Sequence, residues 1–137
     1  MTVEGEPPTG PEPPPRHFTR EEANSALPAL RRLLQRLRDA KDMLTDAEAH
    51  EALSEAAPTN GGGEPGAQVG EAFLQVRRLL ASLQTQGIVI RDIDRGLIDF
   101  PALIDGQEAY LCWELGEDSV DWWHGPEEGF TGRQPLD

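Results

Sequence analysis

Leucine residues recur at alternating steps of three and four along the first third of the chain. This spacing places them on one stripe of a helix, as in helices that pack against a partner in a coiled coil. The stripe consists of Leu27, Leu30, Leu34, Leu37 and Leu44. Thr19 and Glu22 form a capping box before it, and Pro28 is expected to kink the helix. We therefore predict a helix from about residue 20 to residue 54.

A second apolar stripe with the same spacing follows a segment rich in glycine. It consists of Val69, Phe73, Val76, Leu80 and Leu83. Gly87 stands where a helix commonly ends in a left-handed residue, and the segment 56–66 (AAPTNGGGEPG) contains residues that interrupt helices. The two stripes predict an antiparallel helical hairpin over residues 19–87, with a flexible loop at 56–66.

The apolar pattern changes from helical spacing to alternation after residue 87. Residues 88–90 are β-branched, Asp105-Gly106 is a typical hairpin turn, and residues 109–115 alternate between apolar and other side chains. Residues 120–124 form another short run. Pro101 is expected to keep residues 96–104 out of a central, fully paired strand. The sequence therefore predicts an α+β fold: a long antiparallel helical hairpin followed by a small antiparallel β-meander with a C-terminal segment, over residues 88–137.

The strand register across the turn at residues 116–118 has two solutions. With a two-residue loop, Trp113 pairs with Trp122, and His124 joins the core face of the sheet. With a three-residue loop, Cys112 shares a face with His124 instead, because a slip of one residue turns every side chain over. The two-residue register buries more apolar surface and is therefore favoured.

Residues 1–16 contain six prolines and can bury little apolar surface. We predict a disordered Pro-rich tail there, ahead of a single domain at residues 17–137. The tail lacks the charged and then apolar pattern of a signal peptide, and the only cysteine, Cys112, cannot form an internal disulfide. We therefore expect a cytoplasmic protein.

Acidic residues are concentrated in the C-terminal part of the chain. From residue 87 onward, twelve acidic residues face only Arg91, Arg95 and Arg133, which accounts for −9 of the net charge of −13. Such a charge disfavours binding to nucleic acid or to anionic membranes, and it is compatible with divalent cations held by oxygen ligands. Arg133 is expected to pair with Glu117 or Asp99, or else to hold an anionic ligand.

No sequence motif indicates a catalytic nucleophile or a nucleotide-phosphate site. The three glycines at 61–63 lack the Lys and Ser/Thr of a phosphate-binding loop, and no Gly-x-Ser-x-Gly or His-Glu-x-x-His is present. The meander does supply nitrogen, oxygen and sulfur donors, and an imidazole with several carboxylates suits a divalent metal ion of the Zn, Fe or Mn type. The candidate ligands are His124, Glu127, Asp99, Glu114, Cys112 and Glu21.

Each of these donors also has an ordinary structural explanation. A single histidine beside tryptophans is commonly a hydrogen-bonded structural residue, and a lone strand cysteine is commonly a small buried apolar one. Because the favoured register separates Cys112 from His124, the histidine and the carboxylates rank above the cysteine. Glu21 can contribute only if the start of the first helix packs on the meander.

Five short blocks of the sequence stand in an order and spacing that match a known pattern. They are FTREEAN at 18–24, GLIDFP at 96–101, LCWELGE at 111–117, WH at 123–124 and GFTGRQPL at 129–136. Together they resemble the prokaryotic family known as domain of unknown function 2203, over roughly residues 17–136. The resemblance implies a small bacterial cytosolic protein without an established activity, so it supports the domain limits and leaves the function open.

A non-enzymatic interaction module is the alternative to a metal-binding protein. The predicted hairpin carries arginines on its outer surfaces while the meander is acidic, and this bipolar charge can dock a protein partner or drive self-association. The arginines are Arg31, Arg32, Arg36, Arg38, Arg77 and Arg78. Helical hairpins with exposed apolar residues pair readily into four-helix arrangements, so we expect a homodimer. Neither hypothesis names a reaction.

Overall fold

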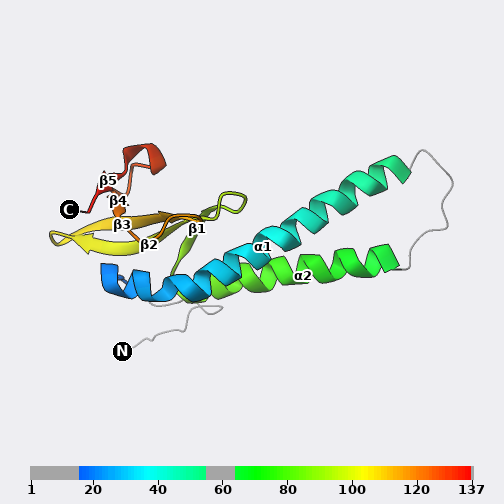
Figure 1. Ribbon diagram of the computed structural model, residues 1–137, viewed down its shortest axis with the longest axis horizontal. Helices are drawn as coiled ribbons and strands as arrows, with labels where there is room; N and C mark the ends of the chain where they lie inside the picture. Colours follow the sequence, from blue (N-terminus) through cyan, green and yellow to red (C-terminus); the bar gives the residue numbers. More distant parts are fainter. Residues whose placement is uncertain (1–15, 55–63, 137) are drawn as a thin grey trace, which may run out of the picture.

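Two long helices are followed by a five-stranded antiparallel sheet in the computed structural model, which describes residues 16–54 and 64–136 (Figure 1). The elements are α1 (Arg20–Ser54), α2 (Glu64–Thr85), β1 (Val89–Asp92), β2 (Leu97–Ile104), β3 (Gln107–Glu114), β4 (Trp122–His124), the 3-10 helix η1 (Phe130–Gly132) and β5 (Gln134–Pro135). The strands lie side by side in chain order. The predicted α+β class is therefore confirmed.

Two of the expected segments lie wholly or mostly outside the described residues. The Pro-rich tail at 1–16 is one, and only its last residue, Arg16, is described. The loop at 56–66 is the other, and α2 already begins at Glu64 within it. Among the described helices, none is both long and apolar enough to cross a lipid bilayer.

The start of α1 is fixed by its cap and by the strand beneath it. The Thr19 amide donates to Glu22 Oε1 (2.9 Å), and the Glu22 amide donates to Thr19 Oγ1 (3.0 Å), which is the predicted capping box. The preceding Phe18 is buried and packs edge-on against Phe100 of β2, with ring centroids 5.1 Å apart. The cap therefore anchors the first turn of α1 to the sheet.

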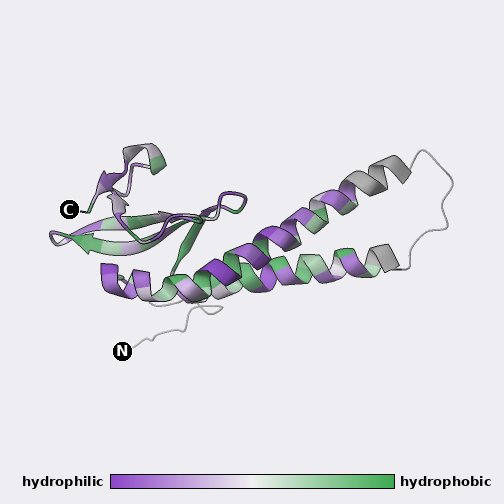
Figure 2. Cartoon of the chain, viewed as in Figure 1, coloured by the Kyte–Doolittle hydropathy of each residue, from purple (hydrophilic) through white to green (hydrophobic). Residues whose placement is uncertain are grey.

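The core lies between the helices and one face of the sheet, while the C-terminal segment lies on the other face (Figure 1). Figure 2 shows hydrophobic residues recurring along both helices. The leucine stripe of α1 contributes Leu27, Leu30, Leu34 and Leu37, each at most 3% exposed. These side chains join Leu79 and Leu83 of α2, Ile98 and Phe100 of β2, and Trp113 of β3. The first predicted stripe is thus a core face.

The second predicted stripe is wrong at Phe73, which is 51% exposed. Leu83 of that stripe is buried, and Val76 and Leu80 are partly buried against the core, while the other buried residues of α2 are Ala72 and Leu79. Successive residues of a helix are rotated by about 100° about its axis. When Ala72 faces the core, the side chain of Phe73 is therefore turned away from it. Leu79 and Leu83 set the rotation of α2, because they belong to the main core and Phe73 does not.

The expectation for Pro101 is wrong in one part, because β2 is a central strand between β1 and β3, and right in the other, because β2 pairs with β1 only at residues 97–99. Pro101 pairs with Tyr110 of β3, and its carbonyl accepts the Phe18 amide (2.7 Å). A residue in a strand points its nitrogen and oxygen to the same side, so the missing N–H of Pro101 faces away from β3. On that side β1 has already ended, because its pairing reaches no farther than Asp99. The proline therefore removes no bond from the ladder.

The register between β3 and β4 differs from the one we favoured. The structure pairs Cys112 with Trp122 and Tyr110 with His124, so Cys112 and His124 share a face. The reason lies in α1. The Asn24 side chain accepts the Val120 amide (2.7 Å), and Arg20 Nε donates to the Val120 carbonyl (3.0 Å). These bonds hold the connection at 115–121 against the helix. The register that we favoured was derived from loop length and apolar pairing, without these contacts to α1.

Replacing Asn24 with alanine is expected to lower the free energy of unfolding by about 1–3 kcal/mol. The variant leaves the buried amide of Val120 without an acceptor, and an unpaired buried polar group costs about that much. Urea unfolding followed by circular dichroism measures the change. Ser25→Ala, at the next and exposed position of α1, is the control. Equal stabilities for the two variants would contradict this account of the register.

Candidate metal centre

Three potential metal ligands meet on the face of the sheet that is turned away from the helices. Asp99 of β2 pairs with Cys112 of β3, and His124 comes from the neighbouring β4. The alternation of strand residues directs all three to one face. Asp99 and Cys112 are each 1% exposed, and His124 is 2% exposed. The sheet therefore brings together a carboxylate, a thiol and an imidazole, all buried.

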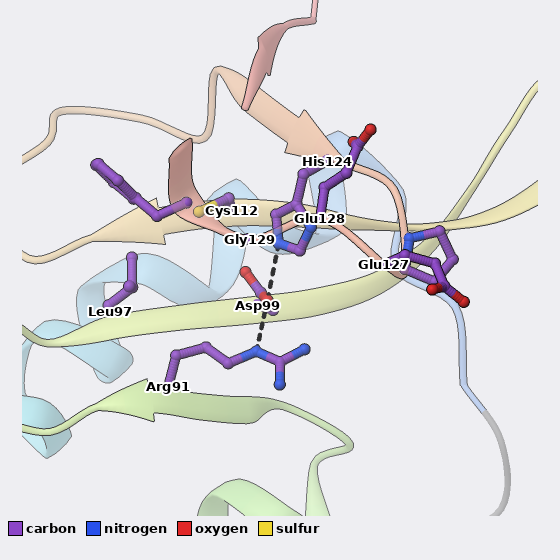
Figure 3. Close-up of a pocket in the computed structure, with 10 residues that line it drawn as sticks. Arg91, Leu97, Asp99, Cys112, His124, Glu127, Glu128 and Gly129 are labelled. Atoms are coloured by element: carbon purple, nitrogen blue, oxygen red, sulfur yellow. Dashed lines mark hydrogen bonds and ion pairs between the residues drawn. The ribbon is translucent and has the colours of Figure 1, made fainter. Parts of the chain in front are cut away.

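The donor atoms of these residues lie within 4.8 Å of one another. His124 Nε2 is 2.9 Å from Asp99 Oδ2, and Arg91 Nε of β1 donates to the same oxygen at 2.7 Å. Figure 3 shows the line of contacts from the imidazole through the carboxylate to the guanidinium, with the Cys112 sulfur beside them. Asp99 is thus the centre of the cluster, because its Oδ2 contacts both the imidazole and the guanidinium.

The hydrogen bonds of His124 determine which ring nitrogen carries a proton. Nδ1 lies 2.8 Å from the carbonyl oxygen of Gly125, which can only accept, so Nδ1 carries the hydrogen. Nε2 then faces the Asp99 carboxylate with a lone pair unless a proton or a cation lies between them. A histidine that binds a metal through one nitrogen typically donates the other N–H to a carbonyl in this way. The imidazole is therefore oriented for binding through Nε2.

Asp99 Oδ1 is buried and accepts no hydrogen bond from the described residues. An unsatisfied buried carboxylate oxygen is costly and calls for a missing partner, such as water or an ion. Burial and, secondly, the negative charge of Asp99 raise the pKa of the Cys112 thiol to about 12. Without a cation the sulfur is consequently protonated, whereas a bound metal would replace that proton.

A cavity of about 330 Å³ opens beside the cluster. The C-terminal segment forms much of its wall, through Pro126, Glu127, Glu128, Gly129 and Phe130. The guanidinium carbons of Arg95 and Arg133 each lie 4.4 Å from the centroid of the Phe130 ring, which holds this segment over the sheet. The cluster thus borders a space large enough for water or a small ligand.

Of the three remaining candidate ligands, only one lies beside the cluster. Glu127 lines the cavity, and Figure 3 shows it to one side of the cluster. Glu114 forms a bidentate ion pair with Arg95 (2.8 and 3.1 Å) and is outside the donor group. Glu21 is exposed on α1, which packs on the opposite face of the sheet. The structure therefore retains Glu127 as a neighbour and gives no support to Glu114 or Glu21 as ligands.

The C-terminal arginine behaves as the sequence indicated. Arg133 Nη2 donates to Glu117 Oε1 (3.0 Å), the first of the two predicted partners. The same Oε1 of Glu117 accepts the Glu114 amide (2.8 Å), and the Glu117 carbonyl accepts the indole N–H of Trp113 (3.1 Å). Glu117 therefore organises the end of β3.

Sequence reasoning missed two residues that shape the centre. Arg91 was noted only as one of three bases, yet it donates directly to Asp99. Glu128 accepts the Gly125 amide through Oε1 (3.0 Å), which positions the backbone that accepts His124 Nδ1. The sequence did contain a signal for Arg91, because a basic residue in an otherwise apolar strand, within an acidic part of the chain, is expected to pair with a carboxylate. No signal distinguished Glu128 from Glu127.

The cluster does not form a nucleophilic triad of cysteine, histidine and aspartate. Such a triad needs an imidazole nitrogen hydrogen-bonded to the sulfur and a thiol whose pKa is lowered. Here Gly125 and Asp99 occupy the two nitrogens, and the pKa of the Cys112 thiol is raised to about 12. Cysteine catalysis therefore does not fit the geometry.

Comparison with known proteins identifies the family. Neither the curated proteins nor the solved structures give a significant match to this sequence. A family model described as "Uncharacterized conserved protein (DUF2203)" matches residues 16–136, which include both helices, the whole sheet and the candidate metal centre. The chain therefore belongs to this family of uncharacterised conserved proteins, domain of unknown function 2203.

Proposed function

We propose that the protein binds one divalent metal ion through Asp99, Cys112 and His124. The observation that carries this proposal is the convergence of three buried donors of different chemistry within 4.8 Å, one of which, Asp99, has an oxygen (Oδ1) without a hydrogen-bond partner in the described part of the chain. Buried polar atoms in native proteins are almost always satisfied. A cation supplies a partner for Oδ1, for the lone pair of Nε2 and for the sulfur at the same time.

The spacing of the donors is compatible with a tetrahedral ion. Bonds from zinc to sulfur, nitrogen and oxygen of about 2.0–2.3 Å place neighbouring donors roughly 3.3–3.6 Å apart. Contraction from the present limit of 4.8 Å by roughly 1.2–1.5 Å meets that requirement. Three protein ligands leave a fourth position, which faces a cavity lined by Glu127. Water or that carboxylate would complete the shell.

The set of donors favours zinc or ferrous iron over magnesium and calcium. Magnesium and calcium take oxygen ligands, whereas one thiolate and one imidazole suit a softer ion. Binding releases the thiol proton, since a coordinated cysteine is a thiolate even where burial disfavours that form. Among the three metals expected from the sequence, manganese is the one that the Cys112 ligand makes least favourable.

A purely structural role for the same residues is the competing explanation. In that case a protonated His124 and Arg91 neutralise Asp99 without any metal. The two explanations differ at Cys112, because the metal-free network uses the sulfur at most for a thiol hydrogen bond to Asp99, whereas the metal site needs a bond to the sulfur itself. The decisive measurements are therefore those that report on a bond between the metal and the cysteine.

Recombinant protein without a histidine tag is expected to contain, or to take up, one zinc ion per chain. Mass spectrometry measures the metal content after purification and again after chelation and addition of Zn²⁺. Co²⁺ is then titrated as a spectroscopic probe, and we expect the ultraviolet charge-transfer absorption of a cobalt–thiolate bond. Protein that takes up neither ion at equimolar concentration, while remaining folded by circular dichroism, overturns the proposal.

Matched variants test whether the metal binds at the proposed site or elsewhere on the protein. His124→Gln and Cys112→Ser should each weaken Zn²⁺ binding by more than about 100-fold, since even a residue that only supports a ligand typically contributes 10- to 100-fold. His17→Gln removes an exposed imidazole that pairs with Glu108, and it should change nothing. Competition with a zinc-binding dye measures each affinity. Equal affinities for His124→Gln and His17→Gln would assign the metal to another place.

A further inference from the structure

The outer face of α2 is exposed from residue 67 to residue 85. It lies opposite the buried line of Ala72, Leu79 and Leu83, because residues five positions apart in a helix are separated by about 140°. The exposed face consists of Ala67, Gly70, Glu71, Leu74, Arg77, Arg78 and Ala81. Leu74 stands at its centre and is 49% exposed, and the adjacent Phe73 is 51% exposed. Large apolar side chains at the middle of a polar face indicate a contact surface.

The surface is also hollowed beside Leu74. Ala67, Gln68, Gly70 and Glu71 line an open hollow of about 550 Å³ together with it. A side chain at Gly70 would meet no other atom within 4 Å. Small residues on a helix surface let a second helix approach closely. The shape of this face therefore accommodates a helix.

The charges on this face are arranged with opposite signs about Leu74. Glu71 precedes it by three residues, and Arg77 and Arg78 follow it by three and four. None of these three charged side chains forms an ion pair within the described residues, and Arg77 only packs over the Phe73 ring (5.9 Å). An acid on one side and bases on the other are complementary to the same helix running in the opposite direction.

We infer that two copies of the chain associate through α2, with the helices antiparallel and the twofold axis at Leu74. In this register Leu74 meets the partner's Leu74, Glu71 lies opposite the partner's Arg77, and Ala67 lies opposite the partner's Ala81. The partner's Arg78 then lies over the hollow at Gly70. Every apolar, small and charged position of the face finds a suitable counterpart, as a twofold contact requires.

Other arrangements of two copies satisfy the face less well. A parallel pairing would place Glu71 against the partner's Glu71 and the arginines against each other, and like charges side by side are unfavourable. The hairpin projects beyond the sheet in Figure 1, so in the antiparallel pair the two sheets lie at opposite ends. The candidate metal centre is on the sheet and takes no part in the contact. This dimer is independent of metal binding.

Reversal of the charges tests the pairing and its direction. Glu71→Arg alone, or Arg77→Glu with Arg78→Glu, places like charges opposite each other. Each exposed pair contributes only a fraction of a tenfold change in affinity, but the pairs at both ends of the contact are reversed together. We therefore expect each of these variants to weaken the dimer at least about tenfold. The two variants mixed should form a heterodimer, and the triple variant should recover the homodimer. Sedimentation velocity over a range of concentrations measures each constant. A monomeric wild-type chain at every concentration, or a triple variant as weak as the single one, overturns the inference.

Cysteine crosslinking tests the position of the axis. Leu74→Cys should form a disulfide-linked dimer rapidly on oxidation, because the two new thiols lie at the axis. Thr85→Cys is on the same exposed face but eleven residues away, so its two copies would be about 33 Å apart along the helices and should not crosslink. The native Cys112 is buried and does not interfere. Equal crosslinking of the two variants shows random collision and rejects the proposed axis.

Discussion

Replacing Asp99 with alanine should lower the free energy of unfolding by about 3–5 kcal/mol in metal-free protein. The carboxylate is 1% exposed, accepts a hydrogen bond from Arg91 at 2.7 Å and lies 2.9 Å from Nε2 of His124. Its removal breaks both contacts and leaves the buried Nε2 of His124 without its partner, and breaking a buried pair on one side typically costs this much. Arg91 is 42% exposed on its side chain and can turn to water, so most of the loss falls on His124.

Guanidinium unfolding in the presence of a chelator measures this change. The matched control is Asp94→Ala, which also removes one carboxylate from an ion pair, there with Lys41 at 2.7 Å. The Asp94 side chain is 63% exposed, and exposed pairs contribute about 0–1 kcal/mol. If the Asp99 variant loses no more stability than the Asp94 variant, then the contacts of Asp99 with Arg91 and His124 do not stabilise the fold, and the account of the centre fails.

Replacing Trp113 with alanine should also cost about 3–5 kcal/mol, for a different reason. The indole is fully buried between the sheet and α1, and removing a large aromatic side chain from a core loses its packing and leaves a cavity. The change also removes the bond from the indole N–H to the Glu117 carbonyl (3.1 Å). Because a domain of this size typically has 5–15 kcal/mol of stability, this variant is expected to be close to unfolding.

Two further variants divide the effect of Trp113 into its parts. Trp113→Phe keeps most of the packing and loses the hydrogen bond, so it should cost less, about 1–2 kcal/mol. Trp122→Ala removes a partly exposed indole from the other face and serves as the control, with an expected loss well below that of Trp113→Ala. Thermal and urea unfolding compare the three. Equal losses at positions 113 and 122 would contradict the assignment of the core face.

The two largest effects therefore come from opposite faces of the same strands. Trp113 stabilises the face that packs on the helices, whereas Asp99, Cys112 and His124 place polar groups on the face that the C-terminal segment covers. Burying such groups is unfavourable unless they are paired, so a fold under selection for stability alone would replace them with apolar residues. Their presence together is what makes metal binding the best-supported function.

Several features followed from the sequence because short-range physics determines them. The capping box at Thr19 and Glu22 and the leucine stripe of α1 appear in the structure as predicted. So does the two-residue turn at Asp105-Gly106, where both residues have positive φ angles (52° and 80°). In each case the deciding interactions are backbone preferences and hydrogen bonds within a few residues, or burial of one face of a regular element. His124 and Asp99 were among the six candidate ligands named from the sequence, and the structure places them together with Cys112.

Only the tertiary structure decided the membership of the site. Cys112 was ranked low because the apolar pattern favoured the other register, and that register was excluded by bonds from α1 to Val120 across 96 and 100 positions of sequence. The rotation of α2 and the acceptance of Pro101 in a central strand depend likewise on neighbours that are distant in the chain. The local sequence pattern determines whether a segment is a helix or a strand. Judged from that pattern alone, several alignments of the segment with its neighbours have nearly the same energy, so the alignments are nearly degenerate. The packing of α1 on the sheet breaks that degeneracy, and with it decides which three side chains face one another.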